Sequence, residues 1–297
     1  KNSNNRMLWN AKMRFGKTLS ALQVIKECDL RRTLILTHRP VVDNGWFEDY
    51  QKIFFDRPEF RYGSKNNGKP LEEGEKLVKN STTGSYIYFA SIQDMRGSEI
   101  VGGKFEKNEI LFSIDWDLII IDEAHEGTQT ELGKRVLAYC KKQYTKELHL
   151  SGTPFNLMDD FKEDEIFTWD YVMEQQAKSD WDILHKGDPN PYACLPKMNI
   201  FTYNLGKLFN EYADADIAFN FKEFFRVDED GIFIHEGNIN QFLNLLSKED
   251  PDSNYPYSKK EYRENFRHSL WMIPGVREAK ALSVLLQQHP VFGCFTI

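Results

Sequence analysis

Cysteine is scarce in this sequence, and long apolar runs are missing. The four cysteines (Cys28, Cys140, Cys194 and Cys294) lie far apart and form no Cys-x-x-Cys pair. This argues against a zinc site and favours free thiols in a reducing cytoplasm. No apolar segment is long enough to span a bilayer, and no signal peptide opens the chain. We therefore expect a cytoplasmic protein with no membrane partner.

Positive charge is in deficit as well, with 38 Lys and Arg against 45 Asp and Glu and a net charge of −7. This balance argues against a protein that wraps nucleic acid by bulk electrostatics, although a local basic groove remains compatible with it. The 297 residues suit two domains better than one. The chain starts at Lys1 without an initiator Met, which we interpret as a fragment of a longer protein.

Strand and helix patterns alternate over residues 7–155, which predicts a doubly wound α/β domain. The continuous apolar run before Asp122 suits a strand covered on both faces, as in a parallel sheet. The polar stretch 61–84 is expected to be rich in loops. The expected strands are 7–12, 32–37, 86–91, 116–122 and 147–151, and the expected helices are 17–27, 41–54 and 131–142.

The pattern changes after Pro154, where acids and aromatics dominate and periodicity weakens. Only 205–212 and 238–247 look helical there. Order returns at the end of the chain, where a strand at 269–273, a helix at 276–288 and a strand at 293–297 predict one βαβ unit. This unit is too small for a domain and is interpreted as a truncated start. The predicted parts are 1–160 (first α/β lobe), 161–265 (irregular accessory region) and 266–297 (truncated start of a second lobe).

A phosphate-binding loop is predicted at Ala11–Thr18, although Ala11 stands where the pattern has its first glycine. Backbone N–H groups and the helix dipole would converge on the phosphates at this strand-to-helix turn. Lys17 would reach the β- and γ-phosphates, and the Thr18 hydroxyl would bind Mg²⁺. The predicted nucleotide-binding residues are Arg14, Phe15, Gly16, Lys17 and Thr18.

Two carboxylates, Asp122 and Glu123, follow the buried strand 116–122. Ligands of open α/β sheets bind beyond the carboxyl ends of the strands. Asp122 is placed to hold Mg²⁺, Glu123 to orient and deprotonate the attacking water, and His125 to sense the γ-phosphate. With Lys17, these are the predicted catalytic residues, and the predicted cofactors are ATP and Mg²⁺.

Three motifs occur in an order that resembles the superfamily-two helicases and translocases. They are the phosphate-binding loop, then Asp122-Glu-Ala-His125, then Ser151-Gly-Thr-Pro154. The Ser-Gly-Thr-Pro version is most similar to the motor subunits of type I and type III restriction enzymes and their DEAD/DEAH-box relatives. The resemblance covers residues 6–156 well and 268–297 loosely. It implies a RecA-like lobe followed by the start of a second one.

The same resemblance implies roles for further residues. Ser151 and Thr153, with His125, would couple hydrolysis to movement. The expected nucleic-acid track consists of Thr37, His38, Arg39, Ser91 and Gln93. Alternatives remain open here, because Thr37 and Ser91 could be capping hydroxyls at strand ends, Arg39 a surface cation and Gln93 a helix-entry side chain.

Two departures from the family pattern bear on activity. The upstream segment that reads adenine in many relatives is absent, so selectivity for ATP is inferred from the family. The second lobe stops before its arginine motif, and such a finger is worth roughly 10³–10⁵ in rate. We therefore expect a chain that binds nucleotide and turns it over poorly.

The resulting function is an ATP-dependent motor, a helicase or translocase acting on nucleic acid, with duplex DNA suggested by the resemblance alone. Nuclease or methyltransferase subunits or fused domains are the expected partners, since no Asp…Glu-x-Lys nuclease cluster is visible. The alternative is a nucleotide-binding switch whose output is a protein contact. Its partner surface would use aromatics of a kind that is more often core: Phe161, Phe167, Trp169, Tyr171, Trp181, Phe221, Phe224 and Phe225.

Overall fold

The computed structural model describes residues 5–80, 84–127, 130–200, 219–250, 255, 257–259, 263 and 268–295. The chain divides into two compact units, Lys1–Leu195 (unit 1) and Pro196–Ile297 (unit 2). Residues 161–195 therefore belong with the first unit, and not with a connecting region that begins at 161.

Within the described residues, unit 1 contains a seven-stranded, wholly parallel sheet in the order β3-β4-β2-β5-β6-β1-β7. This confirms the predicted doubly wound, RecA-like α/β fold. The strands are β1 (Arg6–Ala11), β2 (Arg32–Thr37), β3 (Phe60–Gly63), β4 (Ser85–Ser91), β5 (Leu118–Asp122), β6 (Lys146–Ser151) and β7 (Ile166–Trp169).

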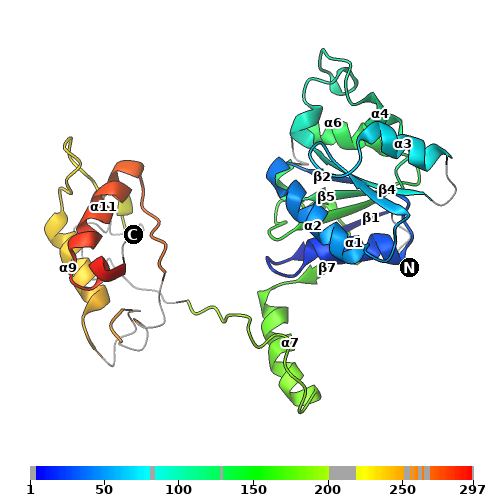
Figure 1. Cartoon of the computed structure of the whole chain (residues 1–297). Helices are drawn as coiled ribbons and strands as arrows, with labels where there is room; N and C mark the ends of the chain where they lie inside the picture. The colour runs from blue at the N-terminus through cyan, green and yellow to red at the C-terminus, as the bar shows by residue number, and fades with distance from the viewer. Residues whose placement is uncertain are drawn as a thin grey trace. The chain divides into compact units, whose positions relative to one another are not determined.

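Helices cover both faces of this sheet (Figure 1). Leu22 of α1 and Trp46 of α2 pack on one face, while Leu111 of α4 and Val136 of α6 pack on the other. Burial on both faces explains why the apolar runs of β2 and β5 are continuous. The helices of unit 1 are α1 (Lys17–Glu27), α2 (Asp43–Ile53), α3 (Leu71–Asn80), α4 (Glu109–Ser113), α5 (Ala124–Gly127), α6 (Glu131–Cys140) and α7 (Tyr171–Leu184).

The predicted loop-rich stretch 61–84 is wrong, because it contains most of β3 and the whole of α3. The strand exists through its pairing with β4, and α3 packs close to the sheet. A Cβ on Gly74 of α3 would lie 2.1 Å from the Tyr86 ring, so glycine permits that approach. The irregular region predicted from residue 161 likewise contains β7 and α7.

Unit 2 is helical where it is described, with α8 (Phe221–Phe224), α9 (Glu236–Ser247) and α11 (Val276–Gln288) around a core of its own. The helices predicted at 238–247 and 276–288 are confirmed, and the one at 205–212 lies outside the described residues. The two closing strands are wrong: 269–273 is not a strand, and Phe292–Phe295 is a 3-10 helix. Trp271 and Phe292 pack against each other instead of pairing in a sheet, with ring centroids 5.6 Å apart.

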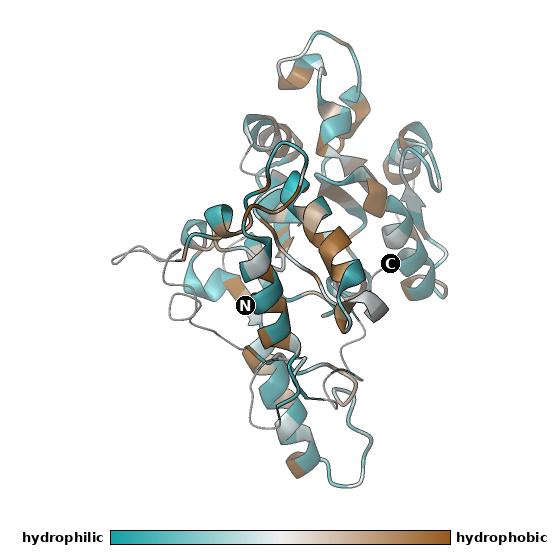
Figure 2. Cartoon of the chain, turned by 90° about the vertical axis from the view of Figure 1, so that its left-hand side faces the viewer, coloured by the Kyte–Doolittle hydropathy of each residue, from teal (hydrophilic) through white to brown (hydrophobic). Residues whose placement is uncertain are grey.

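Hydropathy follows the helical period, and the helices are banded brown and teal along their length (Figure 2). Within the described residues, no helix is both long and apolar enough to cross a membrane.

Candidate functional site

The predicted phosphate-binding loop at Ala11–Thr18 (the P-loop) joins β1 to α1 and places a helix N-terminus at the carboxyl edge of the sheet. Gly16, the residue before α1, has φ 89°, and Arg14 has φ 67°. A Cβ on Gly16 would meet nothing within 4 Å, so the left-handed backbone, and not space, favours glycine here. The first intrahelical bond runs from Ser20 N to Gly16 O. The N–H groups of the first turn therefore lack intrahelical partners and suit an anion.

Lys17, the first residue of α1, folds back over this loop. Its Nζ donates to the carbonyl oxygens of Ala11 at 2.8 Å and Lys12 at 3.3 Å. Burial lowers the pKa of Lys17, and the charges of Glu123 and Asp122 act against that shift. The cation therefore lies near both carboxylates and at the mouth of the loop, where a phosphate would meet it.

Asp122 ends β5 on the same edge, and burial raises the pKa of its carboxyl group. Hydrogen bonds and the charges of Lys17 and Arg39 oppose this shift. Asp122 Oδ1 accepts from Glu123 N at 3.0 Å, and Oδ2 accepts from the indole Nε1 of Trp46 at 3.0 Å. Sequence reasoning missed Trp46, because only the folded sheet brings α2 to β5.

Glu123, His125 and Ser151 come together beside this carboxylate. Glu123 has φ 49°, a conformation that is costly for a residue with a side chain. His125 Nδ1 lies 2.8 Å from Ser151 Oγ and 3.5 Å from Glu123 Oε2. Ser151 Oγ also accepts from Thr153 N at 3.2 Å. The acidic turn and the end of β6 therefore form one connected group.

The Ser-Gly-Thr-Pro segment also approaches the P-loop. A Cβ on Gly152 would lie 3.6 Å from Ala11 O and 3.7 Å from Lys17 Nζ. Three predicted motifs, far apart in sequence, thus meet at one edge of the sheet.

Only some side chains of the predicted nucleic-acid track are exposed to solvent. The hydroxyls of Thr37 and Ser91 are buried and accept the N–H groups of Arg39 at 3.1 Å and Gln93 at 3.2 Å. The capping alternative therefore holds for both hydroxyls. Arg39 is exposed but forms a two-pronged ion pair with Glu126 of α5. Gln93 is exposed, and His38 is half-buried.

Phe15 points to the other side of the loop. Its ring centroid lies 5.9 Å from that of Phe167 and 6.1 Å from that of Trp169, both on β7.

The aromatics considered for a partner surface are mostly core or half-buried. Phe224 and Phe225 are buried, while Phe221 is 50% exposed.

The residues at the P-loop and at the end of β5 fit a metal–nucleotide complex. A buried carboxylate whose pKa is raised by desolvation gains from a nearby cation, and Asp122 and Thr18 supply oxygens of the kind Mg²⁺ prefers. No cluster of three or more His, Cys, Asp or Glu suited to a metal occurs in the described part of the chain. Asp122 and Thr18 would therefore hold Mg²⁺ here together with phosphate oxygens and water.

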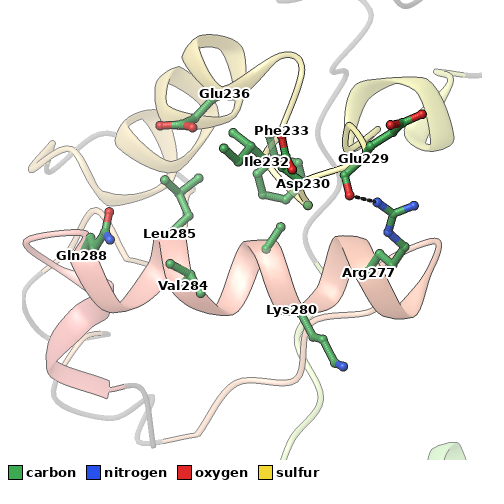
Figure 3. A pocket seen from close by; sticks show the side chains of 12 residues that line it. Glu229, Asp230, Ile232, Phe233, Glu236, Arg277, Lys280, Val284, Leu285 and Gln288 are labelled. Carbon is green, nitrogen blue, oxygen red and sulfur yellow. Dashed lines mark hydrogen bonds between the residues drawn. The ribbon is translucent and has the colours of Figure 1, made fainter.

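Unit 2 contains a hollow of about 520 Å³ that no predicted site residue lines. It lies between α11 and the turn 229–233, with Ile232, Val284 and Leu285 on its apolar walls (Figure 3). Arg277 Nη2 donates to Glu229 O at 2.9 Å and closes one end.

Comparison with known proteins agrees with this geometry. Residues 1–156 match the model of the family described as type III restriction enzyme, res subunit. A Mycoplasma pneumoniae protein, with the provisional name of a type II restriction enzyme and methyltransferase (C-terminus), is 25% identical over 350 aligned residues. The alignment covers 97% of this chain and 47% of that protein, so the chain spans about half the length of this relative.

Solved structures found to be similar include an ATPase core, a helicase and a terminase. The Sulfolobus solfataricus SWI2/SNF2 ATPase core in complex with dsDNA is 20% identical, with TM-score 0.35 and coverage of 52% of this chain and 29% of that one. The UvsW helicase of bacteriophage T4 is 16% identical, with TM-score 0.35 and coverage of 56% and 55%. The large terminase of a thermophilic bacteriophage is 12% identical, with TM-score 0.38 and coverage of 62% and 46%.

Proposed function

This chain belongs to the family of the type III restriction enzyme res subunit, and from that premise we propose that unit 1 is the ATP-binding lobe of a nucleic-acid motor. One observation carries the proposal. Lys17, at the N-terminus of α1, lies within electrostatic reach of the Asp122–Glu123 pair at the carboxyl edge of a parallel sheet. A loop for phosphates, a cation and two carboxylates at one point suit nucleoside-triphosphate hydrolysis.

Each residue has a part in the proposed reaction. The first turn of α1 and Lys17 bind the phosphates, and Thr18 with Asp122 would hold Mg²⁺, which neutralises phosphate charge when bound. Glu123 orients the attacking water and accepts its proton. His125, held by Ser151, transmits the state of the site to the Ser-Gly-Thr-Pro segment, whose Gly152 lies beside Lys17.

The proposed substrate is duplex DNA, with the exposed residues Arg39 and Gln93 and the half-buried His38 on its path. Movement along DNA requires a second lobe to close on the nucleotide and reopen after hydrolysis. The relative's name joins a restriction enzyme to a methyltransferase. We infer that this motor likewise works beside nuclease or methyltransferase subunits or fused domains.

Calorimetric titration of the chain with Mg²⁺–ATP tests the nucleotide site. Lys17→Ala removes the cation that meets the β- and γ-phosphates, so we expect binding to be lost. Lys134→Ala, an exposed lysine of α6, is the matched control and should bind as the wild type does. Unchanged affinity in Lys17→Ala would refute the proposed site.

A further inference from the structure

The wall of the P-loop that faces away from Asp122 is aromatic. In the sheet order β5-β6-β1-β7, the loop follows β1, so Asp122 at the end of β5 and Trp169 at the end of β7 lie on opposite sides of it. Trp169 pairs in register with Ala11, the last residue of β1. All these strands are parallel, and their carboxyl ends share one edge.

This aromatic wall consists of Phe15 from the loop and Phe167 and Trp169 from β7. The Phe15 ring is tilted by 49° to Phe167 and by 45° to Trp169, at centroid distances of 5.9 and 6.1 Å. All three side chains are half-buried, so each keeps a surface outside the core. Tyr192 extends the group, with its centroid 6.3 Å from that of Trp169.

The wall is tied firmly to the phosphate loop. Lys12 N donates to Trp169 O at 3.0 Å, which continues the pairing of β1 with β7. Lys12 Nζ lies 2.5 Å from Glu174 Oε1, and Glu174 is a buried carboxylate of α7. The rings are therefore held at a set distance from the loop, as a preorganised binding surface requires.

A nucleoside triphosphate bound in this loop has its two ends on different sides. Its terminal phosphate belongs at Lys17 and Asp122, where the charges are, so the base extends toward β7. We propose that Trp169 and Phe15 form the platform on which the base stacks; this rests on the proposed nucleotide site. Stacking uses the π-face that every base has. The platform therefore accepts any nucleobase, and does not by itself select adenine over guanine.

The test distinguishes contacts to the base from contacts to the phosphates. The chain is titrated by calorimetry with Mg²⁺–ATP, Mg²⁺–GTP and Mg²⁺–tripolyphosphate, which has phosphates and no base. Trp169→Ala should weaken ATP and GTP alike by about 5- to 150-fold, the range measured for base–aromatic stacking. Tripolyphosphate affinity should stay unchanged. Trp169→Phe keeps a ring and should restore most of the loss, and Tyr144→Ala, which removes an exposed aromatic (68% exposed), is the control.

The other outcomes are equally decisive. Equal losses for ATP and tripolyphosphate in Trp169→Ala would mean that Trp169 only supports the loop, and would overturn the platform. Unchanged ATP affinity, or a loss confined to ATP, would overturn it as well. A wild-type chain that binds none of the three compounds would overturn the nucleotide site itself, whereas one that binds tripolyphosphate as tightly as ATP would overturn the platform alone.

Discussion

Arg39 and Glu126 form a two-pronged ion pair, in which Arg39 Nε donates to Glu126 Oε2 at 2.7 Å and Nη2 donates to Oε1. The hydrogen bond from Arg39 keeps the pKa of Glu126 below its ordinary value, so the carboxylate is charged. The Arg39 side chain is 55% exposed, so water and salt screen its attraction to Glu126. A DNA phosphate can therefore compete with Glu126 for the guanidinium.

This pair leads to a first prediction, on DNA binding. Glu126→Gln frees Arg39 for phosphate, so affinity for duplex DNA should rise and the slope of log affinity against log salt should steepen by about one. Arg39→Gln should do the reverse. Fluorescence anisotropy with labelled duplex at several salt concentrations measures both. Asp49→Asn breaks a different surface pair, with Lys52, and is the control. Identical salt slopes in Glu126→Gln and wild type would remove Arg39 from the track.

A second prediction concerns Trp46 and pH. Burial raises the pKa of Asp122, and the Trp46 hydrogen bond opposes that shift. Mg²⁺ requires the carboxylate, so Mg²⁺–ATP affinity should fall as pH is lowered toward the Asp122 pKa. Trp46→Phe removes the indole N–H and raises this pKa further, so the fall should begin at a higher pH. Calorimetry over a pH series shows it, and superimposable profiles would contradict the role given to Trp46.

The third prediction is about stability. Glu174 is 3% exposed and pairs with Lys12, so Lys12→Ala leaves a buried carboxylate without its cation. Breaking such a pair costs about 3 kcal/mol, which lowers the unfolding midpoint by about 6–12 °C for a unit of this size. Lys69 and Glu73 form an exposed pair (50% and 53%), and Lys69→Ala should change the midpoint little. Equal shifts for the two variants in scanning calorimetry would refute the argument.

Hydrolysis provides the fourth prediction. In the complete protein, Glu123→Gln should bind Mg²⁺–ATP with wild-type affinity and release almost no phosphate, because the amide cannot accept the proton of the attacking water. Glu131→Gln, an exposed acid of α6, should hydrolyse normally. Wild-type turnover in Glu123→Gln would exclude it as the base.

The parts of the fold that could be read from the sequence are those with a local cause. The strand before Asp122 carries a continuous apolar run, and α1 begins at the glycine–lysine pair that marks a P-loop. The site residues at these points lie together as expected, because parallel strands deliver their carboxyl ends to one edge.

What the sequence did not predict depends on partners far along the chain. β3 and β7 are four-residue edge strands, defined by their pairing with β4 and β1. Short apolar runs suit either a sheet or a helical core, so the pattern at 269–273 and 293–297 does not distinguish them. In the structure, Trp271 and Phe292 pack in the helical core of unit 2. Trp46 carries no motif, and only the folded sheet brings its indole to Asp122.

The left-handed backbone of Glu123 has a consequence for anyone who engineers this protein. A non-glycine residue at φ 49° costs about 1 kcal/mol, so Glu123→Gly or Glu123→Asn should make the fold more heat-resistant. A thermostability screen would therefore favour substitutions at position 123, and the variants it selected would have lost the residue that we propose as the base for water. At this position, directed evolution for robustness and directed evolution for activity pull in opposite directions.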